Sequence, residues 1–172
     1  MATNWRSFRP CPVAESRYLT RGAIEPAALL AAISDPSLGG TALFLGTVRR
    51  GTEDGPVASI EYTAYEDMVD AEFGRILAEA ARRWPHGRMV ACHRVGTVPA
   101  GEASIAIAAA MPHRADAFAA CRFVVEEAKR RLPIWKLEIL DDGSRRWRDA
   151  QPAAAPAPTE GAEGAEGAEG TG

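Results

Sequence analysis

Two long segments with helical spacing of apolar residues, separated by two shorter apolar runs, limit the fold of this chain more than any other feature. The first predicted helix covers about 67–84, and the second covers about 114–132, where Pro133 ends it. The runs 88–98 and 103–110 are short enough to be strands, and the PAGE turn between them indicates a hairpin. Two helices can bury their apolar faces on such a sheet, so the pattern predicts an α+β fold.

Further elements are predicted on both sides of this centre. They are a short helix that begins at Pro26, strands at 41–48 and 60–65, and a last hairpin of 134–140 and 145–148. The segment 49–56 is predicted as a loop. The strands are therefore expected to be hairpin-linked and largely antiparallel, packed against the two long helices.

Composition divides the chain into three parts. Residues 151–172 are a low-complexity stretch without aromatic or branched apolar side chains, so we expect a disordered tail. Residues 1–15 are polar and contain prolines, and we expect a flexible lead-in. Residues 16–150 are then expected to form one domain.

The charge balance excludes some function classes. The tail holds four Glu and no Lys or Arg, and the rest of the chain has 20 basic against 19 acidic residues. A protein that mainly coats nucleic acid or an anionic membrane carries a larger excess of one sign. We therefore expect neither nucleic acid nor a membrane as a partner, and we look for a local cationic site.

The cysteines and the motif scan predict no metal and no cofactor. Cys11, Cys92 and Cys121 have neither zinc-site spacing nor the pattern of a disulfide framework, so buried or unreactive thiols are expected. Nucleotide-binding GxGxxG and Walker A patterns, the HExxH metal pattern, the GxSxG hydrolase pattern and the EF-hand pattern are all missing from the sequence. With no apolar leader at the start, the expected location is the reducing cytoplasm.

The two lysines stand out because 18 of the 20 basic residues are Arg. Lys129 and Lys136 lie seven positions apart on either side of Pro133. A lysine ammonium can lose its proton when it is desolvated or crowded by other cations, whereas arginine stays protonated. Both lysines are thus candidates for acid, base or nucleophile. The alternative is that they are chance survivors of an arginine-rich composition, and this observation alone does not separate the two.

A phosphate site is a second candidate. His113 and Arg114 stand at the start of the second long helix, where free N–H groups favour an anion. Taken alone, the better interpretation is that His113 only caps the helix and Arg114 faces water. Arg49, followed by Arg50, comes directly after the strand 41–48, a weaker sign of a binding group. The two other histidines, His86 and His93, are interpreted as structural.

Four segments resemble the large-subunit family of molybdopterin synthase in order and spacing. They are GGTALFLGTVRR, IEYTAYEDM, MPHRADAFAACRFVVEEAKRRLPIWKLE and the final RRW. The most specific part is HRADAF followed by AKRRLPIWK, which contains both lysines. Met111 stands where a Ser is common in the family. The resemblance covers about 16–150.

This resemblance implies a hammerhead-type α+β subunit that forms a central homodimer, with a small ubiquitin-like sulfur-carrier subunit at each end of a heterotetramer. The carrier's C-terminal Gly-Gly thiocarboxylate would donate sulfur to cyclic pyranopterin monophosphate, or precursor Z, to form molybdopterin. By matching motif positions, Lys129 and Lys136 take catalytic places, and Arg49, His113 and Arg114 take substrate-binding places. The enzyme would be a sulfurtransferase that needs no cofactor of its own.

Two other functions stay open on the sequence. The first is an RNA- or polyanion-binding module with an arginine-rich surface. Its residues would be Arg82, Arg83, Arg88, Arg130, Arg131, Arg145, Arg146 and Arg148. The second is a non-catalytic scaffold for a ubiquitin-like partner, in which both lysines would be dispensable.

Overall fold

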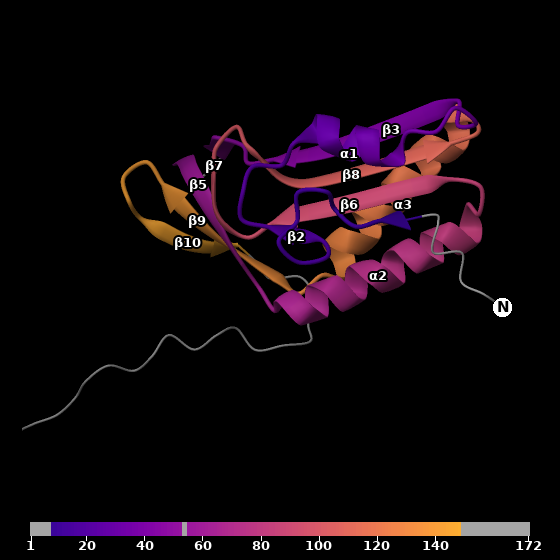
Figure 1. The fold of residues 1–172 in the computed structure, drawn as a ribbon. Coiled ribbons are helices and arrows are strands. Elements are labelled where there is room, and N and C mark those ends of the chain that lie inside the picture. Colours follow the sequence, from indigo (N-terminus) through magenta and orange to yellow (C-terminus); the bar gives the residue numbers. More distant parts are fainter. Residues whose placement is uncertain (1–7, 53–54, 149–172) are drawn as a thin grey trace, which may run out of the picture.

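The computed structural model describes residues 8–52 and 55–148, which form helices and strands in two sheets (Figure 1). The helices are α1 (Pro26–Ile33), α2 (Glu66–Arg83) and α3 (Arg114–Arg131). The strands are β1 (Phe8–Arg9), β2 (Leu19–Thr20), β3 (Gly40–Thr47), β4 (Gly51–Thr52), β5 (Gly55–Ala64), β6 (Arg88–Arg94), β7 (Gly96–Pro99), β8 (Ala103–Met111), β9 (Ile134–Leu140) and β10 (Arg145–Arg148). The predicted α+β class, with largely antiparallel strands and two long helices, is confirmed.

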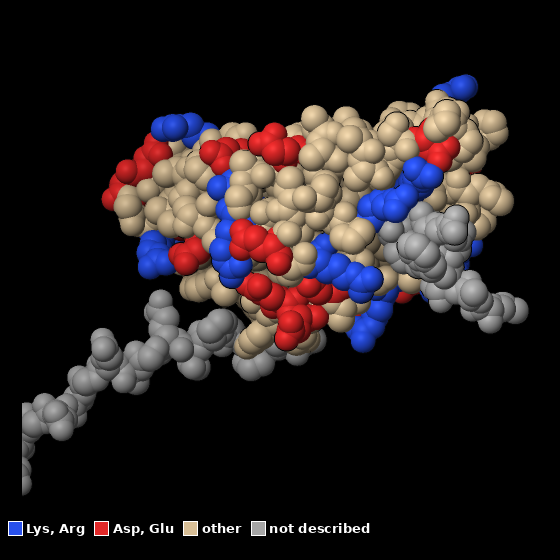
Figure 2. Space-filling view, in the orientation of Figure 1, with Lys and Arg blue, Asp and Glu red and all other residues tan. Residues whose placement is uncertain are grey.

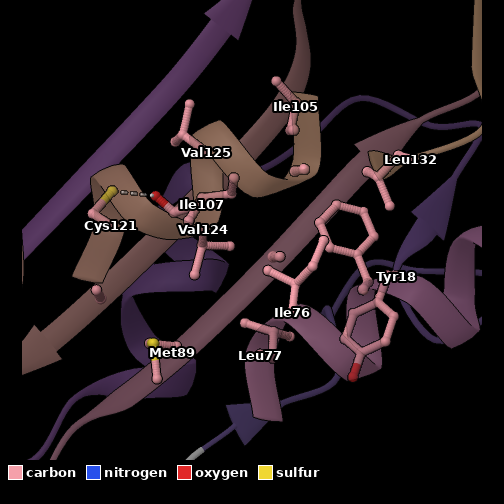
Figure 3. Close-up of a cluster of buried hydrophobic side chains, with 14 of the residues drawn as sticks. Tyr18, Ile76, Leu77, Met89, Ile105, Ile107, Cys121, Val124, Val125 and Leu132 are labelled. Atoms are coloured by element: carbon pink, nitrogen blue, oxygen red, sulfur yellow. Dashed lines mark hydrogen bonds between the residues drawn. The ribbon is translucent and has the colours of Figure 1, made fainter. Parts of the chain in front are cut away.

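The first sheet has the strand order β1-β6-β8-β3, and β2 also pairs with β6. Its two faces bury different residues, because side chains alternate along a strand. On β6, Met89 and Ala91 join the core that α2 and α3 cover, whereas Val90 and Cys92 join a smaller core under α1. Figure 3 shows the larger core, in which side chains of α2, α3, β6 and β8 meet.

The second sheet has the order β10-β9-β5-β4, and β7 pairs with β5. It lies at the end of the molecule where α3 ends and β9 begins (Figure 1). In its register Lys136 of β9 stands opposite Tyr62 of β5 on one side and Arg148 of β10 on the other. Lys136, one of the predicted site residues, therefore lies on β9 between β5 and β10.

The chain departs from the predicted strand 88–98 at one point. β6 ends at Arg94, and Gly96 takes a φ of +81° that a residue with a Cβ rarely adopts. The turn sends β7 into the second sheet, where Gly96 pairs with Tyr62. The single strand predicted over 88–98 is thus wrong, as is the loop predicted over 49–56, where β4 forms and β5 begins.

The beginning of the described chain is more ordered than the expected lead-in of residues 1–15. β1 pairs with β6 in parallel, and Cys11 is buried and forms a disulfide with Cys92, 81 residues away. The expectation of unreactive thiols is therefore wrong for this pair and holds for Cys121, a buried free cysteine. Asp70 of α2 accepts hydrogen bonds from Ser16 Oγ and from the next two backbone N–H groups.

The disordered tail predicted for residues 151–172 lies outside the described residues. Within residues 8–52 and 55–148, no helix is both long and apolar enough to cross a membrane. The same residues contain no group of three or more His, Cys, Asp or Glu side chains placed to hold a metal ion.

Candidate functional site

A pocket of about 530 Å³ lies between the C-terminal end of α3 and the strands β3, β5 and β9. Both lysines of the chain line this pocket, together with Arg49. Ile105 and Gly46 form part of its wall, and a Cβ added to Gly46 would lie 2.5 Å from Ile105 Cγ2. The wall is packed so tightly there that only glycine fits without displacing Ile105.

Lys129 reaches the pocket from the last turn of α3. Its Nζ lies 5.4 Å from the centre of the Phe44 ring on β3, within the range of a cation–π contact. The helix ends two residues later because the N–H of Leu132 closes the last helical bond, to Ala128, and Pro133 cannot continue the ladder.

Lys136 reaches the same pocket from β9, on the other side of Pro133. Its side chain is open to solvent through the pocket, yet the surrounding protein atoms restrict its hydration. Burial, and second the charge of Lys129, lower the pKa of Lys136 from its ordinary value. The structure therefore brings together the two lysines that the composition singled out, and one acts on the other.

Arg49 lines the pocket as an exposed residue just after Val48, which follows β3. Its neighbour Arg50 turns away and pairs with Asp141, with 2.6 Å between Arg50 Nη2 and Asp141 Oδ2. Arg49 therefore lines the pocket, and Arg50 does not.

A buried carboxylate, Glu138, holds the opposite side of the pocket in place. Arg148 Nε donates to Glu138 Oε1 at 2.8 Å, and Arg146 Nη2 donates to Oε2 at 2.6 Å. Burial would raise the pKa of Glu138, but the hydrogen bonds from the two arginines outweigh it and lower the pKa. Glu138 is thus a fixed anion that orients Arg148, itself a pocket residue. The sequence analysis missed this role, although the two arginines stand at alternate positions of a predicted strand and so share one face.

His93 is a second pocket residue that the sequence analysis interpreted differently. It was assigned a structural role, yet it lines the pocket from the end of β6. The ring meets the Tyr62 ring edge-on, with 5.3 Å between the centroids. Tyr62 is also buried in the pocket wall, and its burial raises the pKa of its hydroxyl.

His113 and Arg114 lie elsewhere in the chain. They stand at the start of α3, are exposed, and do not line the pocket. Arg114 is separated from Lys129 by fifteen positions of continuous helix, or about 22 Å at the usual rise. Gly40 lets the helix start approach β3, because a Cβ there would lie 2.9 Å from the backbone of Arg114. Within one chain, three of the five predicted site residues therefore line the same pocket: Arg49, Lys129 and Lys136.

The arrangement suits an anionic ligand. Four cationic side chains line the pocket: Arg49, Lys129, Lys136 and Arg148. Fixed donors of this kind bind phosphate or carboxylate groups, and the lysine with a lowered pKa can also exchange a proton. The pocket can thus combine anion binding with proton transfer.

Comparison with known proteins gives a consistent family. The sequence profile described as "MoaE protein" matches residues 19–131. The chain is 41% identical over 136 residues to a molybdopterin synthase catalytic subunit of Oryza sativa subsp. indica, covering 73% of this chain and 70% of the relative.

Solved structures agree. The chain resembles the molybdopterin synthase of Staphylococcus aureus with a TM-score of 0.74 and 28% identity, covering 77% of this chain and 96% of that one. It also shares its fold with one chain of a complex of subunits 1 and 2 of the molybdopterin-converting factor from Helicobacter pylori. The TM-score is 0.62 and the identity 21%, and the match covers 76% of this chain and 88% of that one.

Proposed function

Because the chain belongs to the MoaE family of molybdopterin synthase catalytic subunits, we propose that it transfers sulfur to cyclic pyranopterin monophosphate and so forms the dithiolene of molybdopterin. It is an enzyme of the molybdopterin synthase type, with a role in molybdenum cofactor biosynthesis. The observation that carries the proposal is the meeting of Lys129 and Lys136 in one cationic pocket. We assign the reaction to the cytoplasm.

The sulfur donor in this proposal is the C-terminal Gly-Gly thiocarboxylate of a small ubiquitin-like subunit. A complex of two subunits is known for the related Helicobacter pylori factor. A Gly-Gly tail carries no side chains and so can enter the pocket without displacing its wall. Each transfer forms one carbon–sulfur bond on the pterin side chain and breaks one carbon–oxygen bond there, whose oxygen leaves as the opened phosphate ester or as water. The acyl carbon–sulfur bond of the donor breaks, and water supplies the oxygen that turns the donor into a carboxylate.

The residues divide the work by their chemistry. Arg49 stays protonated and binds the substrate phosphate, together with His113 and Arg114. Lys136 and Lys129 orient the thiocarboxylate and exchange protons as the carbon–sulfur bonds form. The lowered pKa of Lys136 supports this role, because a neutral amine is then accessible closer to neutral pH.

A homodimer reconciles the substrate-binding role of His113 and Arg114 with their distance from the pocket. Since α3 is a rigid helix, the same chain cannot bring Arg114 to Lys129. We propose that a second copy supplies the pair, so each pocket is completed across the dimer and the assembly with two small subunits is a heterotetramer. Mixed dimers test this point, because a chain lacking His113 and Arg114 should restore activity to a chain lacking Lys136.

Reconstitution tests the function directly. The chain is mixed with a thiocarboxylated small subunit and cyclic pyranopterin monophosphate, and the dithiolene product is measured. Product that depends on all three components is expected. A mixture that binds the partner but yields no product would instead favour the non-catalytic scaffold.

The RNA-binding alternative finds less support in the structure. Six of its eight arginines pair with carboxylates: Arg88, Arg130, Arg131, Arg145, Arg146 and Arg148. Figure 2 shows acidic and basic groups interleaved over the visible face of the molecule. Phosphate backbones are bound by unopposed cations, so this surface is poorly suited to them. Steeply salt-dependent binding to mixed RNA would reverse this judgement.

A further inference from the structure

His93 is a buried polar side chain of the pocket that the mechanism above does not use. The residue is 6% exposed and lies on the face of β6 that points toward α2 and α3, as Met89 and Ala91 do. It pairs in register with Ile105, another residue of the pocket wall. A buried histidine costs desolvation, so its place in a binding pocket calls for a specific role.

One hydrogen bond determines the tautomer of the ring. His93 Nδ1 lies 2.8 Å from the carbonyl oxygen of Arg94. A carbonyl can only accept, so Nδ1 carries the hydrogen. Burial, and in addition the nearby charge of Lys136, lower the pKa of His93 to about 4, so the ring is neutral at ordinary pH. Nε2 is therefore an unprotonated acceptor.

This acceptor has no partner within the described chain. The hydrogen bond to Arg94 is the one that the His93 ring makes there. Nε2 is not among the unpaired side-chain atoms that are fully enclosed within the described residues, so it keeps some accessible surface. The pocket that His93 lines is the space in which a ligand could meet it.

The other polar groups of the wall make this acceptor unusual. Arg49, Lys129, Lys136 and Arg148 can only donate while protonated, and both oxygens of Glu138 already accept from arginines. The hydroxyls of Thr47, Tyr62 and Ser104 can donate as well as accept, so they do not select for a donor as Nε2 does. A phosphate or thiocarboxylate anion offers only acceptors and so cannot form a hydrogen bond with Nε2. A heterocycle with ring N–H or amino groups, in contrast, can donate to an atom that only accepts.

We propose that His93 is a specificity-determining residue, whose Nε2 accepts a hydrogen bond from an N–H group at the edge of the heterocyclic substrate. The backbone bond of Nδ1 and the edge contact with Tyr62 hold the ring at the required angle. His93 thus recognises the ring while the cations hold the phosphate. This inference rests on the proposed function, since it takes the substrate to be a pterin.

A pair of amide substitutions separates the two ring nitrogens. His93→Asn keeps a donor near Nδ1 for the Arg94 carbonyl but removes the acceptor at Nε2, whereas His93→Gln places its oxygen near Nε2. Binding of the cyclic pterin and of inorganic phosphate is measured by calorimetry, and melting temperatures report the fold. We expect His93→Asn to weaken pterin binding roughly 10- to 100-fold and to leave phosphate binding unchanged, as loss of one buried hydrogen bond does. His93→Gln should stay within a few-fold of wild type.

Steady-state kinetics of the His93 variants give a second test of the weakened pterin binding. A contact made equally in ground and transition states raises KM and leaves kcat nearly constant. His86→Asn, at an exposed position outside the pocket, is the matched control and should match wild type in both constants. Should both His93 variants unfold, a pterin analogue methylated at its ring nitrogens gives the answer with the wild type, which should bind it as weakly as His93→Asn binds the pterin.

The outcomes distinguish the two levels of inference. If His93→Asn binds the pterin as tightly as wild type, or if His93→Gln loses more affinity than His93→Asn, the role assigned to Nε2 is wrong while the enzyme assignment stands. If wild type forms no dithiolene with its partner and pterin, the proposed function itself fails, whatever the His93 variants do.

Discussion

Lys136→Arg is the most informative substitution in the pocket. It keeps the positive charge on β9 but replaces an ammonium with a lowered pKa by a guanidinium that does not release its proton at working pH. An arginine that served only to hold phosphate would work nearly as well as lysine. The substitution therefore separates proton transfer from anion binding at a single position.

The size of the effect follows from the surroundings of Lys136. The residue stands opposite Tyr62 and Arg148 in the neighbouring strands, which fix the point on β9 from which its side chain enters the pocket. Loss of general acid–base catalysis typically costs about 100-fold or more in kcat. We expect a fall of that size, with partner binding close to wild type. The effect at Lys129→Arg should be smaller, because Lys129 is not held between paired strands.

The assay is single-turnover formation of dithiolene from preformed complex, which removes partner binding and product release from the rate. Arg130→Lys is the control, since Arg130 is 68% exposed in its side chain and contacts Glu127 one turn earlier on the same helix. It should be silent. Near-normal rates in both lysine variants would refute the catalytic assignment and return Lys129 and Lys136 to the status of anion-binding charges.

Three other predictions follow from the structure. Because burial and Lys129 lower the pKa of Lys136, Lys129→Ala removes a like charge and should move the corresponding ionisation in the pH–rate profile to higher pH; an unmoved or downward-shifted profile would argue against the coupling. Reduction of the Cys11–Cys92 disulfide, which spans 81 residues, should lower the unfolding free energy of wild type but not of Cys11→Ser. Loop entropy puts the loss at about 4.5 kcal/mol, and identical denaturation curves with and without reductant would contradict it. Glu138→Gln should cost about 2 kcal/mol in the same assay, because it removes the anion that accepts hydrogen bonds from two partly exposed arginines. The lowered pKa of Glu138 means that its contribution is present above its unfolded pKa and disappears as the pH falls through the folded value, so wild type and Glu138→Gln should converge in acid.

Much of the local structure was determined by the sequence alone. The predicted helices 67–84 and 114–132 agree with α2 and α3 to within a residue at each end, because the 3.6-residue spacing of apolar side chains and the stop at Pro133 are local properties. The same holds for the last hairpin, whose turn at Gly143 has a φ of +82°. The family, too, was recognisable from motifs that contain both lysines.

Contacts between residues far apart in the chain depend on tertiary packing. His93 and Glu138 line the pocket although the sequence analysis did not place them in the site. His113 and Arg114, which it did place there, lie far from the pocket. Strand pairing and the length of α3 set these positions. Nothing in the residues next to His93 distinguishes a core histidine from one that borders a cavity. That difference arises when β6, β8 and α3 pack, and packing between segments far apart in the chain leaves no periodic signal in either of them.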